Sequence, residues 1–190
     1  IAYAGIARMY AIMGNLGFAS PKDMLTKAKA ELKKAFELDE NLAEAHAQRA
    51  FIAQWYEWDW AIAENSFKKT FALNPGYAFG HAWYGYYCVV RRRFDEAINE
   101  IKRAQELDPL MPQFYTFSVG IHSASGKLDE AIEEFKKAIE LDPNSGLTYF
   151  HLGVVYILKG LLDDAVRAFE KSRKLVENSG FFSWADGNLA

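Results

Sequence analysis

The sequence predicts an all-α fold in which antiparallel helix-turn-helix hairpins stack along one elongated core. The first observation is a repeat. Residues 94–109 read FDEAINEIKRAQELDP, and related segments start at positions 60, 94, 128 and 162, which are 34 residues apart. An earlier copy starts at Leu25, and a second apolar helical segment precedes each copy. One hairpin cannot bury both of its apolar faces, so the stacked array is the expected folding unit.

The second helix of each hairpin is amphipathic and ends at a defined place. In one copy the apolar residues Ala97, Ile101 and Ala104 recur at helical spacing. Prolines follow three of these helices, where a helix cannot continue, at Pro75, Pro109 and Pro143. Gly126 and Gly160 follow two of the first helices, because glycine readily adopts the left-handed conformation that ends a helix.

Five hairpins are expected to form a single array. Their limits are about 1–42, 43–77, 78–111, 112–145 and 146–179, and residues 180–190 would begin a further repeat. The first hairpin has extra residues after Gly14. Within them, the stretch from Ser20 to Asp23 reads as a helix cap with proline at the first helical position, which predicts an early start for the second helix. The second hairpin has one extra residue in the stretch from Trp55 to Trp60.

The repeat resembles the tetratricopeptide repeat (TPR), whose pattern is W-x2-L-G-x2-Y, then A-x3-F, then P. The last full copy matches this pattern best, at Tyr149, Leu152, Gly153, Tyr156, Ala165 and Phe169. In the fourth copy, Ser118 and Val119 stand where Leu-Gly is usual. The resemblance covers essentially the whole chain. It implies a right-handed superhelical solenoid, an α-α superhelix, that acts as a non-catalytic scaffold for protein–protein interaction.

Residues 46–109 further resemble TPR arrays attached to bacterial signalling and regulatory proteins. The chain also opens inside a predicted helix, without an initiator methionine or a signal peptide. We therefore expect it to be a fragment of a longer signalling or regulatory protein. Its single cysteine, Cys88, excludes a disulfide framework within the chain and suits a cytoplasmic location.

The charge pattern argues against nucleic-acid and membrane partners. The formal net charge is −3, whereas nucleic-acid binders carry a clustered excess of lysine and arginine. No run of 18 apolar residues occurs. Basic pairs such as Lys68-Lys69 follow Glu64 on the same helix, which predicts a solvated, self-paired face. The run from Arg91 to Arg93 follows a helix C-terminus, where cations complement the dipole; a site for an acidic partner is the alternative.

No constellation of catalytic or metal-binding residues stands out. The four histidines, at positions 46, 81, 122 and 151, form no i, i+4 ligand pair. His46 and His81 stand where the family carries tryptophan, so packing is the first interpretation and a metal held between repeats is the alternative. Cys88 likewise occupies a packing position, with a reactive thiol as the alternative. We expect no enzyme activity, no cofactor and no metal.

A partner-binding groove is implied by the resemblance, because the first helix of each TPR hairpin lines the concave face. The expected lining is Phe51, Gln54, Phe79, Ala82, Tyr86, Val89, Gln113, Thr116, Gly120, Ser123, Phe150, Val154 and Ile157. We expect a peptide or helix of a partner protein, apolar or amphipathic, to bind there with Phe51, Tyr86 and Phe150 as anchors. A shallow depression is expected at Gly120.

Two further hypotheses stay open. Trp58 is the extra residue of its loop, and it either contacts a partner or plugs the turn. The alternative function is a homo-oligomerisation module that uses the exposed ends of the array. No polar capping helix follows the last hairpin, so the apolar flank around Val166, Phe169 and Phe182 would be covered by the folded-back end of the chain or by a second molecule, as in a two-fold homodimer.

Overall fold

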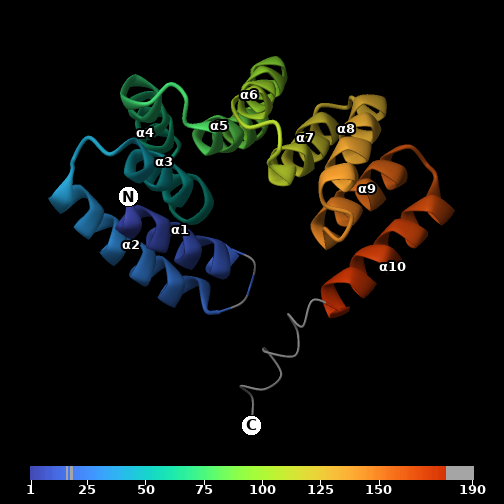
Figure 1. Cartoon of the computed structure of the whole chain (residues 1–190), viewed down its shortest axis with the longest axis horizontal. Coiled ribbons are helices and arrows are strands. Elements are labelled where there is room, and N and C mark those ends of the chain that lie inside the picture. Colours follow the sequence, from blue (N-terminus) through green and yellow to red (C-terminus); the bar gives the residue numbers. More distant parts are fainter. Residues whose placement is uncertain (16, 18, 179–190) are drawn as a thin grey trace, which may run out of the picture. The chain divides into compact units, whose positions relative to one another are not determined.

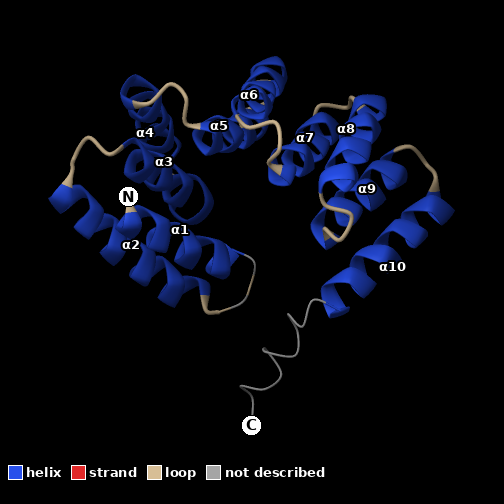
Figure 2. Cartoon of the chain, viewed as in Figure 1, coloured by secondary structure: helices blue, strands red, loops and turns tan. Residues whose placement is uncertain are grey.

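The computed structural model describes residues 1–15, 17 and 19–178, and helices account for all the regular structure in that part of the chain (Figures 1 and 2). The chain divides into two compact units, Ile1–Tyr84 and the part from Gly85 onward, so the boundary falls within helix α5 (Ala78–Val90). The expectation of an all-α protein built from helical hairpins is confirmed.

The first unit contains two hairpins and the start of α5. In the first hairpin, α1 (Ala2–Asn15) packs against α2 (Pro21–Leu38). The Ser20 hydroxyl accepts a hydrogen bond from the backbone N–H of Asp23 at 3.5 Å, and proline occupies the first turn, so the predicted early start of α2 is confirmed. Small residues let the two helices approach closely, and Ala4, Ala7 and Ala28 are almost fully buried.

The extra residue of the second hairpin is absorbed by a change of helix type. Helix α3 (Ala43–Ile52) continues into a π-helix, η1 (Ala53–Glu57), before α4 (Trp60–Leu73) begins. Such one-turn π segments accommodate single insertions in helices. Trp58 then takes the left-handed conformation, with φ of 56°, and the carboxylate of Asp59 caps α4 by accepting a hydrogen bond from the Ile62 N–H at 2.9 Å.

The second unit repeats one hairpin geometry. Its helices are α6 (Phe94–Leu107), α7 (Pro112–Ala124), α8 (Leu128–Leu141), α9 (Gly146–Leu158) and α10 (Leu162–Asn178). The second helices α6, α8 and α10 begin at residues 94, 128 and 162, as the repeat spacing predicts. Each second helix that precedes a proline ends two residues before it, and the residue between is extended (φ −145° at Asp108) because a following proline disfavours the helical region.

The turn between the helices of a hairpin is the same in three successive repeats. Arg92, Gly126 and Gly160 have φ of 60°, 75° and 74°. The next residue in each case donates its N–H to the carbonyl oxygen five residues earlier, at 2.8 to 2.9 Å: Arg93 to Cys88, Lys127 to His122 and Leu161 to Tyr156. This pattern satisfies carbonyl groups that the helix end would leave unpaired. Arginine therefore stands at a position where two other repeats carry glycine.

An apolar core lies between the last four helices. It consists of Val119, Ala131, Phe135, Leu152, Val155 and Ala168. Gly153 lets α9 and α10 touch, because a Cβ atom placed on it would lie 2.5 Å from the ring of Phe169. The family pattern of glycine in one helix and phenylalanine in the next thus reflects one close contact.

Candidate functional site

The expected groove residues of the first unit are part of its interior. Phe51 is 7% exposed, and its ring centroid lies 5.2 Å from that of Trp83 and 6.2 Å from that of Trp55. Ala82 and Gln54 are buried. Phe79 is half-buried, with the guanidinium carbon of Arg8 at 5.0 Å from its ring centroid. Phe51, Ala82 and Gln54 thus present almost no surface to a partner, and the expectation that Phe51 is an anchor is corrected by its burial.

The expected depression at Gly120 is occupied by a neighbouring side chain. The Tyr86 hydroxyl lies 2.6 Å from the point where a Gly120 Cβ would stand, and the His151 ring lies 3.3 Å from that point. The Tyr86 ring also meets Phe117 edge-on, at 5.5 Å between centroids. Burial raises the pKa of Tyr86 and lowers that of His151, so both groups are neutral near pH 7. Glycine here makes room for Tyr86 instead of a ligand.

Three more of the expected groove residues lie on α7, and they differ in exposure. Thr116 is buried, and its hydroxyl shares a hydrogen bond of 2.7 Å with the hydroxyl of Thr148 on α9. Gln113 is exposed at the start of α7, and Ser123 is half-buried near its end. Val89, on α5, is half-buried. In the middle of the expected groove, packing therefore buries Thr116 and fills the space at Gly120, while Gln113, Ser123 and Val89 keep contact with water.

An exposed apolar stripe remains on α9. Leu147, Phe150 and Ile157 are 47%, 47% and 49% exposed, and the half-buried Val154 lies between the last two. Spacings of three, four and three residues place these four side chains on one face of the helix. Phe150 is held at its inner edge by Phe169, at 5.7 Å between ring centroids. We call these four residues the α9 stripe.

Histidine and tyrosine at one repeated position have a structural role. The Nε2 atoms of His46 and His81 lie 2.9 Å from the carbonyl oxygens of Glu40 and Pro75, each six residues earlier. In the next repeat the Tyr115 hydroxyl donates to the Pro109 carbonyl at 3.1 Å. In these three repeats the position therefore ties the start of the first helix to the turn before it. Within the described residues, no cluster of three or more histidine, cysteine, aspartate or glutamate side chains could hold a metal ion.

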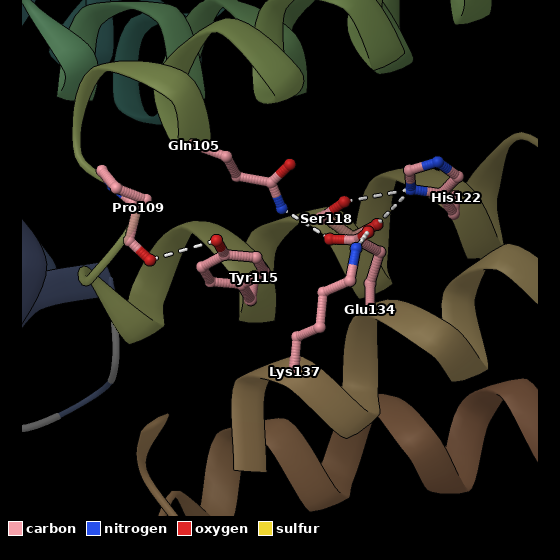
Figure 3. A network of polar contacts seen from close by, with 7 residues as sticks. All are labelled: Gln105, Pro109, Tyr115, Ser118, His122, Glu134 and Lys137. Carbon is pink, nitrogen blue, oxygen red and sulfur yellow. Dashed lines mark hydrogen bonds and ion pairs between the residues drawn. The ribbon is translucent and has the colours of Figure 1, made fainter. Parts of the chain in front are cut away.

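The unusual Ser118 of the fourth repeat belongs to a polar network (Figure 3). Its hydroxyl lies 3.1 Å from the Nδ1 atom of His122, which is buried in the same helix. Nearby, the Gln105 amide donates to the Glu134 carboxylate at 2.5 Å, and Lys137 pairs with that carboxylate at 3.0 Å. The contacts of Glu134 join α6 to α8. The Ser118 hydroxyl finds its partner within α7, which explains why a serine is tolerated in a packing position.

Cys88 and Trp58 differ completely in exposure. Cys88 is fully buried, and a thiol out of contact with water is poorly placed to act as a nucleophile.

Trp58 is 66% exposed, and its ring meets Trp60 edge-on at 5.8 Å between centroids. The exposure fits a partner contact at Trp58 better than a plug in the turn.

Two hollows in the first unit were not anticipated from the sequence. A cleft of about 880 Å³ lies among α2, α3 and α4, and its charged rim is largely self-paired, with Glu57 bound to Lys29 at 2.6 Å and to Arg49 at 2.5 Å. A smaller hollow of about 240 Å³ is lined by Ile1, Ala4, Gly5, Arg8, Glu44, Gln48 and Tyr77. The signal that could have revealed it is Gln48, an amide in the otherwise alanine-rich inner face of α3.

The hairpins and their exposed apolar surface define a class: a helical-repeat protein with the architecture of a protein-interaction scaffold. No helix in the described residues is long and apolar enough to cross a bilayer. Residues 121–160 match the family model described as TPR repeat, and residues 148–175 match that of the tetratricopeptide repeat. The matched part of the chain, residues 121–175, therefore carries tetratricopeptide repeats.

Several solved structures share the fold of this chain. A thermophilic TPR protein of Thermus thermophilus has a TM-score of 0.77 and 17% identity, with 99% of this chain and 100% of that chain covered. The type IV pilus biogenesis factor PilW has a TM-score of 0.73 and 22% identity, covering 92% and 78%. MamA has a TM-score of 0.63 and 25% identity, covering 84% and 93%. A comparison with curated proteins finds no significant match.

Proposed function

We propose that the chain is a non-catalytic scaffold that binds an apolar or amphipathic segment of a partner protein. The observation that carries the proposal is the α9 stripe, in which three large apolar side chains are each about half exposed along one helix face. Exposed apolar rows of this spacing match the i, i+3, i+7 anchors of a helix that packs in a groove. PilW, one of the proteins of similar fold, is described as a pilus biogenesis factor, which is consistent with a role in assembly.

Phe150 is the proposed central anchor of this surface. Its ring packs on Phe169 at one edge and leaves 47% of its surface in water, so it is both positioned and available. Aromatic anchors of this kind typically lose about 2 kcal/mol or more of binding free energy when truncated to alanine. Because each 1.4 kcal/mol of binding free energy changes the affinity tenfold, we expect Phe150→Ala to weaken binding of the partner about 30-fold or more.

The test is a selection of displayed peptides on the whole chain, followed by titration calorimetry of a selected peptide. The expected peptides carry apolar residues at helical spacing, and the expected variant effect is the loss given above. Leu110→Ala is the matched control, because Leu110 is 76% exposed but lies outside α9. If Phe150→Ala keeps its circular dichroism spectrum and binds the peptide as tightly as the original chain, the α9 stripe is not the binding site.

A second candidate, self-association, is favoured by the outer face of α10. Leu162 and Val166 are 65% and 56% exposed, and their spacing of four residues places them together. The flank expected from the sequence was Val166, Phe169 and Phe182. Phe169 packs against Phe150, and Phe182 lies outside the described residues. An apolar face of this kind would pair with its own copy in a two-fold dimer, because a two-fold interface is closed and self-complementary.

A further inference from the structure

The smaller hollow of the first unit is lined by a glutamine whose amide group has no partner. Gln48 is 1% exposed, and neither its Nε2 nor its Oε1 atom makes a hydrogen bond within the protein. Buried polar side chains are nearly always hydrogen-bonded, because leaving both halves of an amide unpaired is unfavourable. An amide in this state at the wall of a hollow points to a ligand group that supplies one acceptor and one donor.

The charged side chains around the hollow favour neither a cation nor an anion. Arg8 and Glu44 both line it, so an ion of either sign would face one opposite and one like charge. The guanidinium carbon of Arg8 already lies 5.0 Å from the centroid of the Phe79 ring. Burial raises the pKa of Tyr77, which keeps its hydroxyl protonated and neutral. The preference for an amide therefore comes from the Gln48 amide itself.

The size of the hollow limits what can enter. Its volume of about 240 Å³ is below the 300–1,000 Å³ that is typical of sites for drug-sized ligands. One wall is open at Gly5, where an added Cβ atom would meet nothing within 4 Å. The space therefore suits one side chain better than a length of main chain or a whole helix.

We propose that this hollow binds the side-chain amide of a single asparagine or glutamine residue of a partner protein. The guest amide pairs with the Gln48 amide, its N–H donating to Oε1 of Gln48 and its oxygen accepting from Nε2. Because the Gln48 amide is covered in the structure, it turns into the hollow as the guest enters. The proposal extends the scaffold function to a second, polar contact within Ile1–Tyr84, so it can fail while binding at the α9 stripe persists.

The first test uses blocked amino acids and a direct readout of the Gln48 amide by heteronuclear NMR. N-acetylglutamine N-methylamide is expected to shift the Gln48 side-chain NH₂ signals saturably. The corresponding blocked methionine, of similar length without a side-chain amide, is expected to leave them unchanged. Blocked glycine and blocked glutamate test the main-chain amide and the carboxylate. Equal shifts with blocked glycine, stronger binding of blocked glutamate, or no saturable shift with any probe would each overturn the proposal.

The second test uses a matched pair of variants. Gln48→Leu removes both amide atoms at similar volume, and at least a tenfold loss of blocked-glutamine affinity is expected. Gln54→Leu is the control, because Gln54 is also buried with both amide atoms unpartnered, but it does not line the hollow. Gly5→Leu fills the hollow while keeping Gln48, and it should abolish binding as well. Unchanged binding in Gly5→Leu, or equal loss in Gln54→Leu, contradicts the site.

Discussion

At the residue scale, the clearest irregularity is an arginine in a glycine position. Arg92 has φ of 60°, and the equivalent residues of the next two repeats are Gly126 and Gly160. The turn is the same in all three repeats, so the backbone of the array and not the local residue imposes this conformation. For a residue with a Cβ atom, the left-handed region costs about 1–2 kcal/mol.

Replacing Arg92 with glycine should therefore stabilise the protein. We expect Arg92→Gly to gain about 0.5–1 kcal/mol, because relief of the strain exceeds the extra entropy that glycine loses on folding. Chemical denaturation followed by circular dichroism would measure it. Gly126→Ala is the reciprocal change: an added Cβ there meets nothing within 4 Å, so any loss of stability reports backbone strain alone. If the Arg92→Gly protein is less stable than the original, the arginine side chain contributes more free energy of folding than the backbone strain at this position costs.

The histidines illustrate how a residue type can mislead until its contacts are known. His46, His81 and Tyr115 all reach a backbone carbonyl six residues earlier. Tyrosine is not a usual zinc ligand, but its hydroxyl can make the same hydrogen bond to a carbonyl oxygen as the histidine ring. The shared geometry thus supports the packing interpretation over a metal site at this position.

At the element scale, helix pairs approach closely only where a small residue permits it. Gly153 on α9 faces the ring of Phe169 on α10, and three ring atoms would lie within 2.7 Å of an added Cβ. Any side chain at position 153 must push α9 and α10 apart or displace the ring. The same ring positions Phe150 of the α9 stripe, so packing and the proposed binding surface are linked.

We expect Gly153→Ala to destabilise the second unit. Overpacking of this kind usually costs about 1–3 kcal/mol, and the greater helix propensity of alanine offsets only about 1 kcal/mol of that. Thermal denaturation should show a lower midpoint. Gly5→Ala provides the comparison, since it adds the same methyl group to a helix where nothing lies within 4 Å, and it should not destabilise. A Gly153→Ala protein as stable as the original would mean that Phe169 moves aside freely.

At the scale of the whole molecule, partner binding and self-association draw on different apolar surfaces. The α9 stripe and the outer face of α10 expose apolar side chains on successive helices. Exposed apolar patches on soluble proteins commonly mark interaction sites. Self-association through the α10 face can therefore be tested separately from partner binding at the α9 stripe.

Sedimentation over a wide range of protein concentration would test self-association through α10. If Leu162 and Val166 form the contact, the original chain should shift from monomer to dimer as concentration rises, and Val166→Glu should stay monomeric because the dimer would bury a charge. Arg167→Glu is a control at the neighbouring, exposed position. Association that is unchanged in Val166→Glu would place the contact elsewhere.

Local features of the sequence are enough to predict the helices and the hairpins. The 34-residue spacing, the prolines after helices and the capping residues near Ser20 depend on local chemistry, which is visible in the chain. The helices α4, α6, α8 and α10 accordingly begin at the predicted positions 60, 94, 128 and 162. The exact response to the extra residue near Trp58 was not foreseeable, because the insertion could enter the loop or, as happens, convert the end of α3 into a π-helix.

Which of the expected groove residues contact water depends on packing between helices and could not be predicted from the sequence. Helical periodicity reports which face a residue occupies, but its exposure depends on side chains from neighbouring helices. Tyr86 covers Gly120, and Trp83 covers Phe51, whereas Phe150 stays half exposed. The unpartnered amide of Gln48 is likewise a property of its surroundings, since the same residue on an exposed face would be hydrogen-bonded to water.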